Sequence, residues 1–315
     1  MSKIGIHFSG AARHDGFKDY LKQAADAGSP FAAVFSVDQN IVPDVLAVSP
    51  KTFTVFRHQM PHKDGARDDA VLGQGEPYAV GVGWFSQAAK TFVKNPGFSA
   101  YCCTNELNPN NPAHHKWAAA YWLGMMNAAT DAGYTIVWGN FSAGCPNLFD
   151  WAAYYGDCLR FAAQHGHILG LHEYGLDRGA MRNAAPHLTL RYYDAYLAIV
   201  AAGLPCPQII ISECAPGSNV DKDLRSLLLD LEWYDAALMN DAAAGVPIVG
   251  ACLYQWGGDE AKPFADAMPV ITAHVIGHPD NEPEPEIVTV SVKIHRQYLP
   301  ELTEWCAIRG STVTA

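Results

Sequence analysis

Basic residues are few in this chain. Lys and Arg together number 21 against 32 Asp and Glu, which gives a formal net charge of −11. Proteins that bind a phosphate backbone use an excess of Lys and Arg to release counterions from it. No such excess exists here, so we expect no nucleic-acid partner, and a neutral substrate suits the charge balance better than a polyanion.

Long apolar runs and paired cysteines are also missing. No stretch approaches the 18 consecutive apolar residues of a membrane-spanning helix. The opening "MSKIGIHFSG" lacks the apolar core and small-residue cleavage site of a signal peptide. The eight cysteines form no CxxC pair and no zinc-like spacing, which favours reduced thiols. We therefore expect no membrane association, and a protein that is cytoplasmic or released by lysis.

What the chain does contain is a regular alternation of short apolar runs and helical patterns. Residues 3–8, 31–37, 52–58, 98–105, 134–140, 166–174, 208–213 and 246–256 are the strand candidates. The clearest helix candidates are 114–133, 148–166, 188–203, 223–245 and 262–277. Several of them end at a glycine that suits a left-handed C-cap: Gly133, Gly166, Gly203 and Gly245. The helical pattern is poor after residue 37 and after residue 60.

Eight apolar strands separated by helices predict parallel pairing with both faces of the sheet covered. Eight such units match a (β/α)8 TIM barrel, an α/β fold in which closure removes the sheet edges. The alternative is an open, doubly wound sheet, but no GxGxxG or GxxxxGK[ST] motif follows any strand. We predict a single catalytic barrel over residues 1–278, followed by a Pro- and Glu-rich connector and C-terminal tail over residues 279–315.

Polar residues collect where the predicted strands end, which is the face where barrels of this kind carry their active sites. Two of these residues are glutamates, Glu106 in "TNE" after the fourth strand and Glu213 in "ISE" in the seventh. Cleavage of a glycosidic bond uses two carboxyl groups, one to protonate the leaving oxygen and one to attack the anomeric carbon or to activate water. Either residue alone is more simply interpreted as a loop acid; the pair, with Asn105 beside one of them, indicates a glycosidase.

This ordered set of residues resembles the clan A glycoside hydrolases, which are retaining (β/α)8-barrel enzymes. Members carry Asn-Glu at the end of strand four and Glu at the end of strand seven, and "TNE" and "ISE" match those positions. The segments "HEYG", "LRYYD" and "IIISE" also look like poorly characterised barrel hydrolases from bacteria and phages. The resemblance covers roughly residues 3–277 and implies cleavage of a β-linked glycan or glycoside by double displacement, without a metal or another cofactor.

The resemblance also implies roles for individual residues. Glu106 would be the acid/base and Glu213 the nucleophile. Asn105 would bind a sugar hydroxyl, Tyr174 or His172 would donate to Glu213, and Trp256 would lie under the sugar ring. The predicted substrate-binding residues are Arg57, His58, Asn105, Trp138, Asn140, His172, Tyr174 and Trp256. For Trp138 a place in the core is an equally good interpretation.

Three alternatives stay open on sequence alone. Glu173 is a third carboxyl near the proposed pair, although strand alternation turns it away from the face that His172 and Tyr174 share. A metal-dependent barrel hydrolase would need an HxH-like pair in the first strand, where only His7 is available, and the chain has no HExxH motif. A non-catalytic carbohydrate-binding barrel would lack one catalytic glutamate. The sequence does not specify the sugar, endo or exo action, or the oligomeric state.

Overall fold

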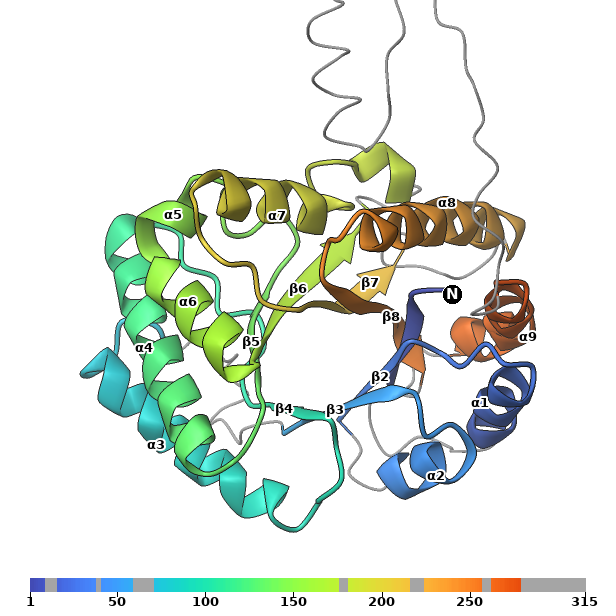
Figure 1. Cartoon of the computed structure of the whole chain (residues 1–315), viewed down its shortest axis with the longest axis horizontal. Helices are drawn as coiled ribbons and strands as arrows, with labels where there is room; N and C mark the ends of the chain where they lie inside the picture. The colour runs from blue at the N-terminus through green and yellow to red at the C-terminus, as the bar shows by residue number, and fades with distance from the viewer. Residues whose placement is uncertain are drawn as a thin grey trace, which may run out of the picture.

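The protein is a parallel barrel surrounded by helices (Figure 1). The computed structural model describes residues 1–8, 16–37, 41–58, 71–175, 181–215, 224–256 and 262–278. Its strands are β1 Ile4–Phe8, β2 Ala33–Ser36, β3 Phe53–Arg57, β4 Ala100–Cys102, β5 Val137–Phe141, β6 Ile168–Tyr174, β7 Ile209–Ala215 and β8 Ile248–Trp256. They pair in the order β4-β3-β2-β1-β8-β7-β6-β5. A parallel bridge from Tyr101 to Ile136 joins β4 to β5 and closes the sheet. The predicted (β/α)8 fold is confirmed.

Helices follow the strands along the chain and cover the outside of the barrel. They are α1 Phe17–Asp26, α2 Ile41–Val48, α3 Pro77–Phe92, α4 Pro112–Asp131, α5 Asp150–Tyr154, α6 Gly156–His165, the 3-10 helix η3 Met181–Ala184, α7 Arg191–Ala201, α8 Leu224–Ala243 and α9 Lys262–Ile276. The four glycines predicted as C-caps all have positive φ, between 70° and 96°. The helix predicted over 148–166 is wrong in one respect: it is two helices, because the chain turns at Tyr155 between α5 and α6.

The sequence pattern was weakest where α3 forms, and local capping accounts for this helix. Pro77 occupies the first turn, where a missing N–H costs nothing, and the Glu76 carboxylate accepts hydrogen bonds from the next two backbone N–H groups. Gly81 then lets α3 approach α4 closely. A Cβ at this position would lie 2.0 Å from the Tyr121 carbonyl oxygen, so no larger residue fits. The unit is therefore specified by caps and close packing more than by apolar periodicity.

The core has two layers. The larger layer lies between the strands and the helices, and it includes Trp122, Trp138 and Trp151. The smaller layer fills the barrel itself with one aromatic side chain and eight short or branched ones: Phe35, with Ala33, Val55, Ala100, Cys102, Val137, Ile168, Ile210 and Cys252. The barrel interior is tight, since a Cβ on Gly5 would lie 2.5 Å from the Ala33 carbonyl oxygen. The polar residues at the carboxyl ends of the strands lie directly above this packed layer.

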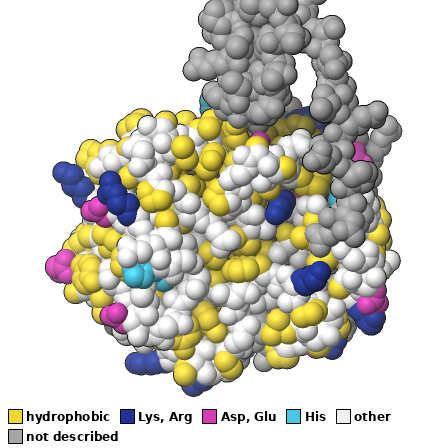
Figure 2. Space-filling model, in the orientation of Figure 1, with side chains coloured by type: hydrophobic (Ala, Val, Ile, Leu, Met, Phe, Trp, Pro, Cys, Tyr) yellow, Lys and Arg dark blue, Asp and Glu magenta, His cyan; other side chains and the backbone are white. Residues whose placement is uncertain are grey.

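Charged side chains on the described surface are sparse. Figure 2 shows Lys and Arg side chains lying singly around one face, with hydrophobic and uncharged side chains across its middle. Among the described residues, no helix is long and apolar enough to cross a membrane. The predicted connector and tail, residues 279–315, lie outside the described residues.

Candidate active site

The candidate site lies at the carboxyl ends of the strands, where the side chains that face the barrel interior are polar instead of apolar. In β3, Val55 belongs to the interior apolar layer, and Arg57 follows it on the same face. In β1 the same alternation brings His7 into the interior, where it is completely buried. A single layer above the packed floor thus carries ionisable groups from several strands.

A β-bulge in β7 turns Glu213 into this layer. Against β6, Ile211 pairs with Leu171 but Glu213 pairs with His172, so β7 carries one extra residue, Ser212. The register against β8 shifts across the same residues. Strict alternation from interior Ile210 would have pointed Glu213 outward; the inserted residue reverses the direction.

Glu213 is buried and surrounded by donors. Arg57 Nη1 donates to its Oε1 at 2.7 Å, and Tyr174 Oη donates to its Oε2 at 2.8 Å. His172 Nδ1 lies 3.5 Å from Oε2, and His7 Nδ1 lies 3.9 Å from Oε1. Burial opposes ionisation, but the charges of His172, His7 and Arg57, together with the Tyr174 bond, lower the pKa of Glu213 to about 2.

Arg57 and Tyr174 make the two direct hydrogen bonds to Glu213. Burial lowers the pKa of His7 to about 4, so its ring is neutral there. The His7 Nδ1–H donates to the Ser212 carbonyl at 3.0 Å, which holds the bulged strand in place. Glu213 is therefore a carboxylate held ionised by a permanent cation and a phenol, as a nucleophile requires.

Glu106 lies across the site from Glu213, four residues beyond β4. Its backbone has φ 50°, a left-handed conformation that is uncommon outside glycine, and its N–H donates to the Asn140 carbonyl at 3.1 Å. Its Oε1 accepts from His172 Nδ1 at 2.9 Å. One oxygen of each glutamate and a nitrogen of His172 all lie within 4.8 Å of one another. The Glu106 side chain is about a third exposed (32%), whereas that of Glu213 is 8% exposed.

Asn105, which directly precedes Glu106 in the chain, shares a hydrogen-bond donor with Glu213. The same Arg57 Nη1 that contacts Glu213 also donates to Asn105 Oδ1 at 2.8 Å. The structure thus brings together six of the residues predicted from sequence: Arg57, Asn105, Glu106, His172, Tyr174 and Glu213.

Three other predicted residues point elsewhere. Trp138 is completely buried outside the barrel, against Trp122 and Tyr155, so it is not placed to contact a substrate. Asn140 is also completely buried and bonds Ser212 and the Thr104 carbonyl, which makes it a support beneath the site. His58 lies beside Phe92 of α3, with ring centroids 6.5 Å apart, on the helix side of β3.

These placements correct the expectation that Trp138, Asn140 and His58 bind substrate. Ordinary alternation turns Trp138 outward, because its neighbour Val137 faces the barrel interior, and it turns His58 away from Arg57. Asn140 is the extra residue of the bulge in β5. For Trp256 the structure describes only the backbone, which pairs with Phe8 of β1. The predicted role of its side chain stays a prediction.

Glu173, the third carboxyl, faces away from the site. Its Oε1 accepts from the Tyr192 N–H, and its Oε2 accepts from the Leu190 N–H and Tyr234 Oη, at 2.6 to 2.8 Å. It therefore anchors the N-terminus of α7 to β6 and contacts α8. Burial raises the pKa of Glu173 to about 7, against the pull of these three donors. Strand alternation predicted this direction of the Glu173 side chain correctly.

Three contributors were not among the predicted site residues: His7, Ser212 and Tyr254. Ser212 resembles an ordinary buried strand residue, and its role depends on the bulge. Tyr254, two residues before Trp256, lies beside Tyr174 with ring centroids 6.2 Å apart and beside His7 at 5.1 Å. Its position on the interior face of β8, in phase with Cys252, was the available signal.

The Glu106, His172 and Glu213 cluster has the spacing of a metal site, but its surroundings are unsuited to one. The Arg57 guanidinium already lies 2.7 Å from Glu213 and would repel a cation bound to the same carboxylate. The donor set therefore fits a pair of carboxyl groups with different protonation states better than a metal centre.

Comparison with known proteins gives structural relatives only. No family model and no curated sequence matches the chain. A β-glycosidase is similar over 86% of this chain and 89% of its own, at 9% identity and a TM-score of 0.52. A hyperthermostable endocellulase is similar over 88% and 93%, at 13% identity and a TM-score of 0.52. An endocellulase from the archaeon Pyrococcus horikoshii gives the same coverage and identity, with a TM-score of 0.51.

The chain shares the barrel fold of these enzymes. At such low identity the likeness is one of architecture alone and assigns no role to any residue.

Proposed function

We propose that the protein is a retaining glycoside hydrolase that cleaves a β-linked glycan or glycoside. The observation that carries the proposal is the placement of Glu106 and Glu213, whose nearest oxygens lie within 4.8 Å at the carboxyl ends of the strands. Retaining enzymes hold their two carboxyl groups about 5–5.5 Å apart, whereas inverting enzymes leave about 6.5–9.5 Å for a water molecule. The short separation favours attack by a carboxylate.

In the first step Glu213 is the nucleophile. One of its oxygens forms a bond to the anomeric carbon as the glycosidic C–O bond breaks, and protonated Glu106 gives its proton to the departing oxygen. The two residues suit these roles because Glu213 is buried and held ionised, whereas Glu106 is partly exposed and carries no arginine contact among the described residues.

In the second step Glu106, now a carboxylate, takes a proton from water. The water oxygen bonds to the anomeric carbon and releases Glu213, so that two inversions give net retention. His172 contacts both carboxylates and orients them, at 2.9 Å from Glu106 and 3.5 Å from Glu213. Arg57 holds Asn105 and Glu213 in one arrangement, and we assign to Asn105 and Tyr174 the contacts with the sugar nearest the cleaved bond.

The preference for a carbohydrate has two supports. The fold is that of a β-glycosidase and of endocellulases, and the charge balance of the chain favours a neutral substrate. Neither support selects one sugar, so the substrate class proposed is a β-linked glycan or glycoside.

The test compares wild type with Glu106→Ala and Glu213→Ala on a panel of β-linked glycans and aryl β-glycosides. Each variant should lose at least about 1,000-fold in kcat/KM, in line with loss of a group that acts in the transition state. Azide should restore Glu213→Ala and yield an α-glycosyl azide, since the small anion attacks from the vacated side. With Glu106→Ala it should yield the β-anomer.

Glu232→Ala is the matched control, because Glu232 is an exposed glutamate on α8. Full activity in both site variants would overturn the assignment, and so would an activity that disappears on chelation and returns only with added metal. The second outcome would favour a metal-dependent hydrolase.

A further inference from the structure

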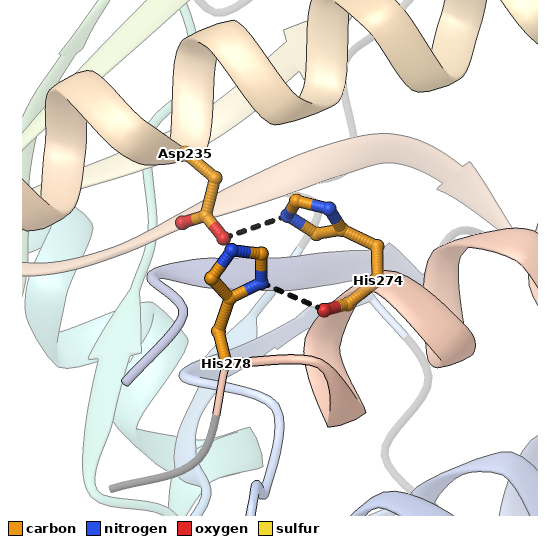
Figure 3. Close-up of side chains that lie close together, drawn as sticks. All are labelled: Asp235, His274 and His278. Carbon is orange, nitrogen blue, oxygen red and sulfur yellow. Dashed lines mark hydrogen bonds and ion pairs between the residues drawn. The ribbon is translucent and has the colours of Figure 1, made fainter. Parts of the chain in front are cut away.

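A second cluster of ionisable side chains lies at the opposite end of the barrel from the glutamates. Asp235 comes from the middle of α8, His274 from the last turn of α9, and His278 from just beyond that helix (Figure 3). The Lys3 N–H, directly before β1, donates to Asp235 Oδ1 at 2.7 Å. Since Lys3 precedes the strand and Glu213 lies near the end of another, the cluster is remote from the proposed active site.

We propose that Asp235, His274 and His278 bind a Zn²⁺ ion, which fastens α8, α9 and the N-terminal strand together. The three residues offer one carboxylate oxygen and two imidazole nitrogens, all within 4.8 Å of one another. Two imidazoles and one carboxylate are a donor set that suits zinc and is poor for calcium or magnesium. His274 and His278 are four residues apart, and the turn after α9 keeps the two rings together, with centroids 4.6 Å apart.

The hydrogen bond of His278 prepares this ring as a ligand. Its Nδ1 lies 2.9 Å from the His274 carbonyl oxygen. Because a carbonyl only accepts, Nδ1 carries a proton, which leaves Nε2 as the ring atom available to bind an ion. Metal-bound histidines are usually fixed in this way, with the second ring nitrogen donating to a carbonyl or carboxylate.

Asp235 is equally constrained. It is completely buried, its Oδ1 is taken by the Lys3 N–H, and its Oδ2 lies 2.8 Å from His274 Nε2. In a tetrahedral site with zinc–ligand bonds of about 2.0–2.1 Å, neighbouring donor atoms stand roughly 3.3 Å apart. The Asp235–His274 pair would open by a few tenths of an ångström as the ion replaces the shared proton. Water would complete the coordination, and partly exposed His278 gives the ion a way in.

The test uses the full chain without an affinity tag, after removal of metal by a chelator. Titration of Zn²⁺ by calorimetry should show one saturable site per chain. Co²⁺ at this site should give the strong visible absorption of a tetrahedral ion. Saturating Zn²⁺ should raise the midpoint of thermal unfolding by several degrees, since an ion that binds only the folded state stabilises it by mass action.

Three variants locate the site. His278→Gln should weaken Zn²⁺ binding by more than about tenfold. Replacing a residue that only orients a metal ligand already costs about tenfold or more in affinity, and loss of a ligand itself should cost at least as much. His165→Gln, the same change at an exposed histidine on α6, should leave binding unaltered. Glu213→Gln should also leave it unaltered, which separates this cluster from the glutamates of the proposed active site.

Absence of a saturable site in wild type would overturn the proposal. Binding that survives in His278→Gln, or disappears in Glu213→Gln, would overturn it as well. Partly exposed His278 is the safest ligand to replace, and a cooperative unfolding transition of metal-free His278→Gln shows that any loss of binding is not a loss of fold.

Discussion

Ser212 Oγ donates to Asn140 Oδ1 at 2.8 Å, and this bond joins two β-bulges inside the barrel. Asn140 is the extra residue of β5 against β6, with φ 42°, and Ser212 is the extra residue of β7. The Asn140 carbonyl accepts the Glu106 N–H, and Glu213 directly follows Ser212. Through Asn140, two hydrogen bonds therefore connect the two segments that carry the proposed catalytic carboxyl groups.

Ser212→Ala should lower kcat by about tenfold or more with little change in KM. The variant removes the donor between the bulges and leaves the carboxyl groups themselves intact, so the loss falls on their alignment. Unfolding free energy should fall by about 1–3 kcal/mol, because the buried Asn140 Oδ1 loses its donor. Steady-state kinetics and urea unfolding provide the two measurements.

Ser86→Ala is the control for this prediction. Ser86 Oγ also donates to an oxygen, the Val82 carbonyl, at 2.8 Å, but on the exposed face of α3. Its kcat should match wild type. An unchanged kcat in Ser212→Ala would show that the bulges hold Glu213 without this bond.

The barrel fold could be predicted from the sequence, and so could the position of Glu106 and Glu213 at one end of it. The fold could be predicted from two features. Uninterrupted apolar strands indicate a sheet that is buried on both faces, and glycines at the helix ends indicate left-handed C-caps. Glu106 and Glu213 could be paired because the topology of a parallel barrel sends all strand ends to one face.

Side-chain direction could not be predicted in the same way. A bulge moves every later residue of its strand to the opposite face, and neither Ser212 nor Asn140 differs in type from ordinary strand residues. Trp138 was assigned to the site on its position in the chain, and the observed packing turns it outward. The helix α3 was missed for another reason, because its stability comes from the Glu76 cap and the Gly81 contact.

Arg57→Met should move the acid limb of the pH dependence of kcat/KM upward by about one to three pH units. Arg57 contributes to lowering the pKa of Glu213 to about 2, and removal of an adjacent opposite charge raises a carboxyl pKa by that amount. The acid limb reports ionisation of the nucleophile in the free enzyme, so activity should fall at a higher pH than in wild type.

Arg160→Met serves as the control for the charge change. Arg160 is exposed on α6 and pairs with Asp157, also exposed. Its pH profile should coincide with that of wild type. If Arg57→Met also leaves the acid limb unmoved, then Glu213 is not the group whose ionisation limits the reaction.

Trp138→Phe should destabilise the protein without weakening substrate binding. Trp138 is completely buried against Trp122, Phe141 and Tyr155, so the smaller ring leaves a void costing about 1–3 kcal/mol. Because it has no exposed surface, KM should stay within about twofold of wild type. A large rise in KM at unchanged stability would instead place the indole in contact with substrate.

Glu173→Gln should change the pH dependence of stability and leave the chemistry nearly intact. The pKa of Glu173 is raised to about 7 in the folded protein, above its ordinary value near 4.5, so the folded state holds this proton more tightly than the unfolded chain does. Its contribution to stability is fully present below about pH 4.5 and is lost as pH rises through about 7. Wild type should therefore lose on the order of 1–3 kcal/mol across this window, and the uncharged variant should lack that component.

The comparison also separates the roles of two neighbouring glutamates. Glu173→Gln places an amide against the backbone donors of α7, so it should be less stable than wild type at pH 4.5, with the gap narrowing toward pH 7. Urea unfolding at both pH values measures the gap. Per folded molecule, kcat should stay near wild type, whereas Glu213→Gln should abolish turnover. A constant gap, or a loss of kcat in Glu173→Gln matching that in Glu213→Gln, would contradict the assignment of Glu173 as an anchor for α7.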